Sequence, residues 1–417
     1  MPFDESLYVA LEKRVAHLEE FYIRGEAPPP VAARSEIPSR SRVLMPTAAS
    51  PLRVGMICEI DAPCGIGEHT QYLVTGFAPV GLTCSWLRHD ATAQEHVGVL
   101  RQCVAEKVDV VHIQHDWSFW RETRGLLDLI RRLHARGIPV VLDFHAVGEA
   151  DSPQQKILRR SVPVAVTHNV RRRSPRGDGP NKNEEFPDDA GPYFDTDLVP
   201  IPLALPVVGP PRGRALLRAA EWVALESGVI FGTFGFLGEH KGHIDVAETV
   251  LELRKRGVPA RFLLMASHHP RNPAEILSRR LADLAGTDPE GILHIDDFLP
   301  IETCVGLLAL ANATVLNYQV DSWSQSGSAA VAAMAGRPVV ASDCPMFADL
   351  PLVRTWPMKD RNKMRQALQD VVDMDLGCET VRVLSWAMDR RADVLAQQYR
   401  DLYERAKERL AICRPTG

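Results

Sequence analysis

The sequence has no two cysteines at the close spacing of a metal-binding or redox motif. Its eight cysteines, spread over 417 residues, form no Cys-x-x-Cys pair and no cluster with histidines at zinc-finger spacing. This absence excludes a small disulfide-held scaffold and a zinc-finger module. We therefore expect reduced thiols, most of them buried, as in a cytosolic protein.

Long apolar runs and an excess of positive charge are also lacking. The best candidate for a membrane span, residues 305–318, is short and contains Asn312 and Asn317. The N-terminus carries acids where a signal peptide would be basic. A formal net charge of −5 gives no general reason to expect nucleic acid as a partner. We expect a cytoplasmic protein that is either free in solution or held peripherally at the inner face of the membrane.

The sequence does contain two series of short apolar segments separated by helical segments. Alternation of this kind builds parallel sheets with helices on both faces. We predict two doubly wound α/β domains, 51–208 and 209–385, with a Pro- and Gly-rich hinge at 206–214. The predicted strands are 53–60, 109–114, 139–145, 162–168 and 197–202, followed by 229–236, 260–267, 292–298, 313–318 and 338–343.

Three further segments flank or interrupt these domains. Residues 1–50 read as an amphipathic helix over 6–24 and a Pro-rich linker. This helix could pair with a copy of itself in a homo-oligomer or dock on the main body, and its short length favours docking. The charged stretch 171–194 reads as a long loop. The final segment, 386–417, is predicted to be a helix that crosses back to the first domain.

Two helix starts in the second domain point to an anion. Lys241 stands at the start of a helix, where its charge opposes the macrodipole unless an anion is bound there as well. Ser326, Gly327 and Ser328 precede the helical run AAVAAMAG, whose first N–H groups are free to bind a ligand. Serine at such a position is often only a cap. Together with Lys241, however, the turn predicts a diphosphate lying between the two helix starts.

The first domain offers a glycine turn and several histidines. Gly65 and Gly67 bracket Ile66 just before a helix, which favours an anion or a closely approaching sugar. His112, His115 and His145 lie at the ends of predicted neighbouring strands. Because carboxyl ends of parallel strands face the ligand cleft, we expect these imidazoles to bind the acceptor or the sugar.

Six motifs, in this order, resemble the retaining glycosyltransferases of family 4: CGIGEHTQYL, DVVHIQHDW, VVLDFHAV, VPIPLALP, GTFGFLGEHKG and SGSAAVAAMAGRPVVASD. The resemblance spans roughly residues 52–405. It implies two facing Rossmann-like domains of the GT-B type, here with an N-terminal helical extension. The second domain would bind a nucleotide-diphosphate sugar and the first a glycan, a lipid-linked acceptor or a small molecule. The implied setting is the assembly of polysaccharides or glycoconjugates.

The resemblance also implies roles for individual residues. His145 corresponds to a histidine that contacts the transferred sugar and is expected to be catalytic, and Lys241 corresponds to a phosphate-binding lysine. Gly65 and Gly67 correspond to a loop that approaches the donor phosphate, and the turn 326–328 to backbone that holds the diphosphate. Phe298 lies near the expected site of the base. We expect no metal and no cofactor, since helix starts and a lysine can neutralise the leaving group and no suitable Asp-x-Asp pair occurs.

The sequence departs from the family pattern at three positions. Trp323 and Val331 stand where the family usually has two glutamates, and Phe236 stands where it has an arginine. Asp321 is the nearest acid, and we expect it to replace the first glutamate as a catalytic group. The departures leave two alternatives open, a catalytically silent partner subunit and a nucleotide-sugar 2-epimerase. An epimerase would need acid and base carboxylates facing the sugar.

Overall fold

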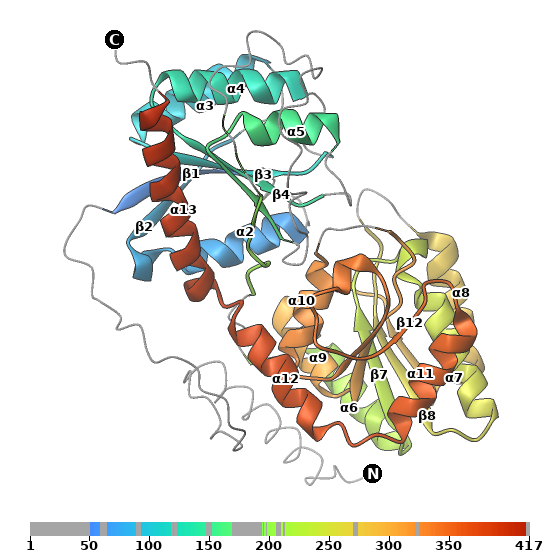
Figure 1. Cartoon of the computed structure of the whole chain (residues 1–417). Coiled ribbons are helices and arrows are strands. Elements are labelled where there is room, and N and C mark those ends of the chain that lie inside the picture. The colour runs from blue at the N-terminus through green and yellow to red at the C-terminus, as the bar shows by residue number, and fades with distance from the viewer. Residues whose placement is uncertain are drawn as a thin grey trace.

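The protein folds into two α/β domains, each built on a six-stranded parallel sheet with helices on both faces (Figure 1). This architecture comes from a computed structural model. It describes residues 51–58, 65–88, 93–117, 120, 123–146, 152–168, 194, 196, 198–205, 210–211, 213–269, 274–321 and 325–413. The predicted helix 6–24, its linker and all of the predicted loop 171–194 except Phe194 lie outside these residues.

The first sheet has the strand order β2-β1-β3-β4-β5-β6, and all of its pairings are parallel. The strands β3, β4 and β5 are buried at every position because helices cover both faces of the sheet. Its elements are β1 (Leu52–Ile57), α2 (Gly65–Thr75), β2 (Leu82–Trp86), α3 (Ala93–Ala105), β3 (Val110–His115), α4 (Thr123–Ala135), β4 (Val140–Phe144), α5 (Pro153–Arg160), β5 (Val164–Thr167) and β6 (Leu198–Pro200).

The second sheet has the order β12-β11-β10-β7-β8-β9 and is likewise parallel throughout. Its elements are α6 (Arg214–Leu225), β7 (Val229–Phe234), η2 (Glu239–Lys241), α7 (His243–Lys255), β8 (Ala260–Met265), α8 (Glu275–Thr287), β9 (Ile292–Ile295), α9 (Ile301–Ala309), β10 (Ala313–Leu316), α10 (Gly327–Met334), β11 (Val339–Ser342), β12 (Leu352–Trp356), α11 (Arg361–Val372) and α12 (Gly377–Met388). Two Rossmann-like domains, as the sequence predicts, are therefore confirmed.

The C-terminal helix α13 (Ala392–Ile412) follows the second domain in the chain but packs on the first (Figure 1). It lies against α2, and two of its own side chains, Tyr399 and Tyr403, are fully buried. The sequence predicts one continuous helix here, whereas the structure has α12 and α13 with a break between them. At this break the Arg390 guanidinium pairs with the Asp349 carboxylate at 2.7 Å, and the Leu205 N–H donates to the Arg390 carbonyl at 2.9 Å. The chain segment after β6 and the segment between α12 and α13 thus cross between the domains side by side.

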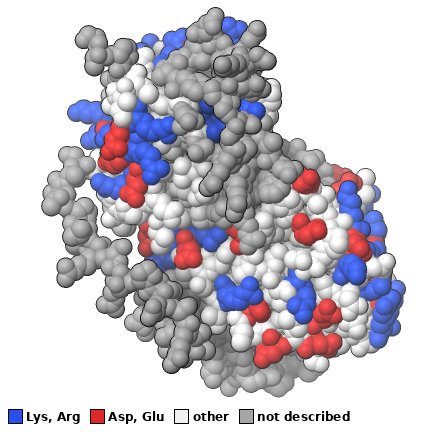
Figure 2. All heavy atoms as spheres, in the orientation of Figure 1, with Lys and Arg blue, Asp and Glu red and all other residues white. Residues whose placement is uncertain are grey.

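The surface charges, the helices and the cysteines can be compared with what the sequence composition predicts. On the face drawn in Figure 2, basic and acidic side chains are interspersed over the second domain. None of the helices that the structure describes combines the length and the apolar composition needed to cross a lipid bilayer. None of the seven cysteines that it describes forms a disulfide bond.

Candidate active site

A cavity of about 320 Å³ lies between the two domains, at the carboxyl ends of their strands. Ligands of doubly wound sheets bind at this edge. The cavity is enclosed by α2, by the crossover that follows β6, and by the turns of the second domain. Its wall is formed by Gly65, Glu68, His69, Tyr72, 203–205, 234–236, Lys241, Met265, Ser267, 297–299, Ile301, Cys304, 325–328, Ala330, Val331 and Met346.

Lys241 is tied to the start of α10 through one tyrosine. Its ammonium group donates to the Tyr318 hydroxyl and lies 4.0 Å from the centre of that ring. The Tyr318 hydroxyl is 2.8 Å from the Ser326 hydroxyl, and Ser326 in turn accepts from the Ala329 N–H as the cap of α10. A cation is therefore held beside the positive end of a helix, which is unfavourable unless an anion completes the site.

Gly235 brings the end of β7 close to these groups. Its φ of +135° is one that side-chain-bearing residues rarely adopt, and a Cβ atom there would stand 2.7 Å from the Ser328 hydroxyl oxygen. The same Cβ atom would lie 4.0 Å from the Lys241 nitrogen. The absence of a side chain at this position thus keeps the space between Lys241 and Ser328 open.

Two stacked aromatic rings form another part of the second-domain wall. The rings of Phe236 and Phe298 are nearly parallel, at 15°, with centroids 5.7 Å apart. Phe298 is 59% exposed, so its ring is available to a flat ligand. The phenylalanine that stands at position 236 therefore adds an aromatic surface beside Phe298, where the family pattern has a charge.

The first-domain wall is built on the start of α2. Gly65 lines the cavity, whereas Gly67 is buried within the helix and does not. His69, four residues after Gly65 and thus on the same helix face, lines it as well. Its Nδ1 accepts from the Ala204 N–H at 2.9 Å, and burial lowers its pKa to about 3, so the ring is neutral. Burial raises the pKa of Glu68 beside it.

The three predicted histidines lie behind this wall. His112 and His115 are fully buried and His145 is 8% exposed. The His112 Nδ1 lies 2.8 Å from the Tyr403 hydroxyl, and the His145 Nε2 lies 2.5 Å from the Gln114 side-chain oxygen Oε1. None of the three lines the cavity. The sequence locates their strand ends, but it misses His69, whose only signal is its helical spacing from Gly65.

The acidic position is also different from the expected one. Asp321 is exposed and is not part of the cavity wall. Val331, which stands at the position of the family's second glutamate, is buried and lines the cavity with an apolar side chain. In contrast to Asp321, the predicted diphosphate-binding residues of the second domain do line the cavity. Lys241, Ser326, Gly327 and Ser328 lie on one wall together with Phe298.

No protein-family model matches this chain, and comparison with curated proteins finds no match in sequence. Solved structures are similar in fold. One, described as trehalose-6-phosphate from E. coli bound with UDP-2-fluoro glucose, has a TM-score of 0.61 and 11% identity over 84% of this chain and 99% of that chain.

Two further structures show the same relationship. A UDP-forming α,α-trehalose-phosphate synthase from Burkholderia xenovorans, in complex with glucose-6-phosphate, has a TM-score of 0.59 and 13% identity over 85% of this chain and all (100%) of the other. A glycosyltransferase from Rickettsia africae has a TM-score of 0.58 and 11% identity over 87% and 99%. These three structures share the fold, but none of them points to glycosyltransferase family 4 in particular. The chain has the two-domain GT-B fold that the sequence resemblance implies.

Proposed function

We propose that this protein is a glycosyltransferase that moves a sugar from a nucleotide-diphosphate donor to a hydroxyl acceptor, with retention of configuration. The observation that carries the proposal is the meeting of Lys241, the capped start of α10 and the open backbone of Gly235 on one cavity wall. A cation, a helix N-terminus and a side-chain-free approach together match the requirements of a diphosphate.

The donor would lie along the second-domain wall. Its diphosphate would bind between Lys241 and the turn 326–328, and its base would stack on Phe298 and Phe236. The presence of UDP-2-fluoro glucose in a structure of the same fold supports this class of ligand. The sugar would then face Gly65, Glu68 and His69 of the first domain.

The chemistry follows from this placement. When the bond between the anomeric carbon and the diphosphate oxygen breaks, negative charge grows on the departing nucleoside diphosphate. The Lys241 ammonium and the N–H groups of α10 stabilise that charge. The acceptor hydroxyl attacks from the face that the diphosphate leaves, which retains the configuration, and its proton passes to the departing phosphate. We assign no metal to this step, because positive groups of the chain meet the diphosphate.

A transfer assay tests the proposal. The protein is incubated with UDP-, GDP- and ADP-sugars and with acceptors that include free sugars and sugar phosphates. We expect release of the nucleoside diphosphate with one donor, and NMR should show the anomeric configuration of the donor in the product. Lys241→Ala should lose this turnover, whereas Lys255→Ala, an exposed lysine at the far end of α7, should retain it.

Two other outcomes would replace the proposal. Tight binding of a nucleotide without release of product from any donor and acceptor would favour the catalytically silent subunit. Conversion of the donor into its 2-epimer, without transfer, would favour the epimerase.

A further inference from the structure

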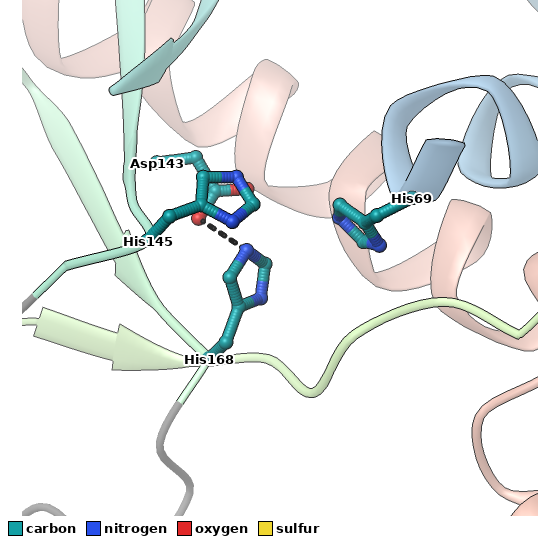
Figure 3. A group of neighbouring side chains, drawn as sticks. All are labelled: His69, Asp143, His145 and His168. Carbon is teal, nitrogen blue, oxygen red and sulfur yellow. Dashed lines mark ion pairs between the residues drawn. The ribbon is translucent and has the colours of Figure 1, made fainter. Parts of the chain in front are cut away.

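A second cluster of polar side chains lies behind the cavity, at the carboxyl edge of the first sheet. It consists of Asp143 near the end of β4, His145 just after β4, His168 just after β5, and His69 from α2 (Figure 3). All four are more than nine-tenths buried. Each offers one nitrogen or oxygen atom within 4.8 Å of those of the others.

The surrounding hydrogen bonds determine where the histidines carry their protons. The His168 Nδ1 lies 2.9 Å from the carbonyl oxygen of Ile201, which can only accept. Nδ1 is therefore protonated, and in the tautomer with a single proton the Nε2 atom presents a lone pair 3.2 Å from the Asp143 Oδ1. In the same way, the His145 Nε2 donates to the Gln114 side-chain oxygen Oε1 at 2.5 Å, which leaves the lone pair at Nδ1.

Asp143 requires positive charge in this setting. Its Oδ2 accepts a hydrogen bond from the Tyr399 hydroxyl at 2.6 Å. Its Oδ1 has no hydrogen-bond partner among the residues that the structure describes, and neither has the His168 Nε2. A fully buried carboxylate that faces lone pairs is strongly unfavourable. Either an extra proton on a histidine or a metal cation must lie between them.

We propose that these side chains bind a divalent transition metal ion, with Zn²⁺ as the test ion. The ligands are the Asp143 Oδ1, the His145 Nδ1 and the His168 Nε2. Two imidazoles and a carboxylate form a donor set that such ions prefer.

Each ligand already has the outer partner that orients a metal-bound side chain. The Gln114 side-chain oxygen holds His145, the Ile201 backbone carbonyl holds His168, and the Tyr399 hydroxyl holds Asp143. Figure 3 shows the rings of His145 and His168 converging on the Asp143 carboxylate.

His69 has a different part in this site. Because its Nδ1 accepts from the Ala204 N–H, its proton lies on Nε2, so that nitrogen cannot bind a metal. The Nε2 atom is buried without a partner among the described residues. It would donate to a water molecule in the fourth position of the ion. The metal would therefore have three protein ligands and one water.

The ion would join parts of the chain that are distant in sequence. Asp143 lies in β4, His145 follows that strand, and His168 follows β5. The Asp143–Tyr399 hydrogen bond extends the connection to α13. The site would order the first-domain wall from behind, away from the phosphate groups at Lys241. His145 would then be a metal ligand and would not contact the sugar.

The test uses the full-length protein without a histidine tag. Metal is removed with a chelator, and the protein is titrated with Co²⁺ while visible absorption is recorded, then with Zn²⁺ in competition. We expect about one equivalent of either ion, with cobalt absorption typical of nitrogen and oxygen ligands. His145→Asn, His168→Asn and Asp143→Asn should each weaken Co²⁺ binding at least tenfold.

His134→Leu is the matched control, because His134 is a buried histidine of the same domain outside the cluster. It should bind Co²⁺ as the wild type does. Zn²⁺ should also raise the unfolding temperature of the wild type and of this control, but not that of the His168 variant. Failure of the wild-type protein to take up Co²⁺ or Zn²⁺ at micromolar concentration would overturn the proposal, whether or not the variants fold. Uptake that is unchanged in all three variants would also overturn it.

Discussion

The Lys241 ammonium donates a hydrogen bond to the Tyr318 hydroxyl and lies 4.0 Å from the centre of the Tyr318 ring. The same hydroxyl meets Ser326, the cap of α10. The position of the lysine therefore depends on β10 and α10 as well as on its own turn. This arrangement orients the charge before any ligand arrives, which reduces the cost of binding an anion.

Tyr318→Phe removes this hydroxyl and keeps the aromatic ring. We expect about a tenfold loss of nucleotide affinity, because a charge-assisted hydrogen bond contributes about 1.5 kcal/mol. Calorimetry with the nucleotide that the wild type binds measures the effect. Tyr72→Phe, on the opposite wall of the cavity, is the control and should bind normally. Equal affinity of the Tyr318 variant and the wild type would show that the hydroxyl does not position Lys241.

Gly235→Ala places a methyl group in the space between Lys241 and Ser328. The backbone there has a positive φ, and the new Cβ atom would approach the Ser328 oxygen to 2.7 Å. We expect loss of nucleotide binding and destabilisation by about 1–3 kcal/mol. Urea unfolding and calorimetry measure the two effects.

Gly286→Ala is the control for that change. Gly286 lies in α8 with nothing within 4 Å of its would-be Cβ atom. Alanine should stabilise this helix by about 0.5–1 kcal/mol and leave binding unchanged. Normal binding by the Gly235 variant would rule out a close approach of the ligand to that backbone.

Phe298→Ala tests the site of the base. Because Phe298 is 59% exposed, its removal should have little effect on stability. Loss of stacking should weaken nucleotide binding about fivefold, since an aromatic contact contributes about 1 kcal/mol. Phe298→Tyr preserves the ring and should bind nearly as well as the wild type. If the alanine variant keeps full affinity, the base binds elsewhere in the cavity.

Acidification should destabilise the first domain through His134. Burial lowers the pKa of His134 from 6.5 to about 4, so the folded protein keeps it neutral where the unfolded chain protonates it. Its contribution to stability is fully present above pH 6.5 and is lost as the pH falls toward 4. The loss is up to about 1.4 kcal/mol per pH unit within this window.

The variant His134→Leu should lack this contribution. Urea unfolding of both proteins at pH 7 and pH 5 should therefore show a smaller loss of stability in the variant. An equal loss in the two proteins would mean that His134 is protonated in the folded state.

The sequence predicts the inner strands of both sheets but misses one edge strand in each. The inner strands are continuous apolar runs because helices bury both of their faces. The edge strands β2 and β12 are only five residues long, are partly buried and include polar residues such as Thr83 and Arg354. They carry too weak a periodic signal to be separated from loops.

Prediction of the site was limited by the direction of the side chains. Backbone features such as a glycine turn or a helix start are local, so the sequence locates Gly65, Lys241 and Ser326 on the cavity wall. A histidine at a strand end can face the cavity or the interior. The buried surroundings of His112 depend on α13, which lies 280 or more residues later in the chain and cannot be read from local pattern.

Calorimetric titration of UDP, GDP and ADP into the wild type, Lys241→Ala and the control Lys255→Ala tests the central claim most directly. We predict that the wild type and the control bind one of the three nucleotides, and that Lys241→Ala binds it at least tenfold more weakly. A wild-type protein that binds none of them, or a Lys241 variant that binds as tightly as the wild type, would contradict the assignment of this cavity to a nucleotide-sugar donor.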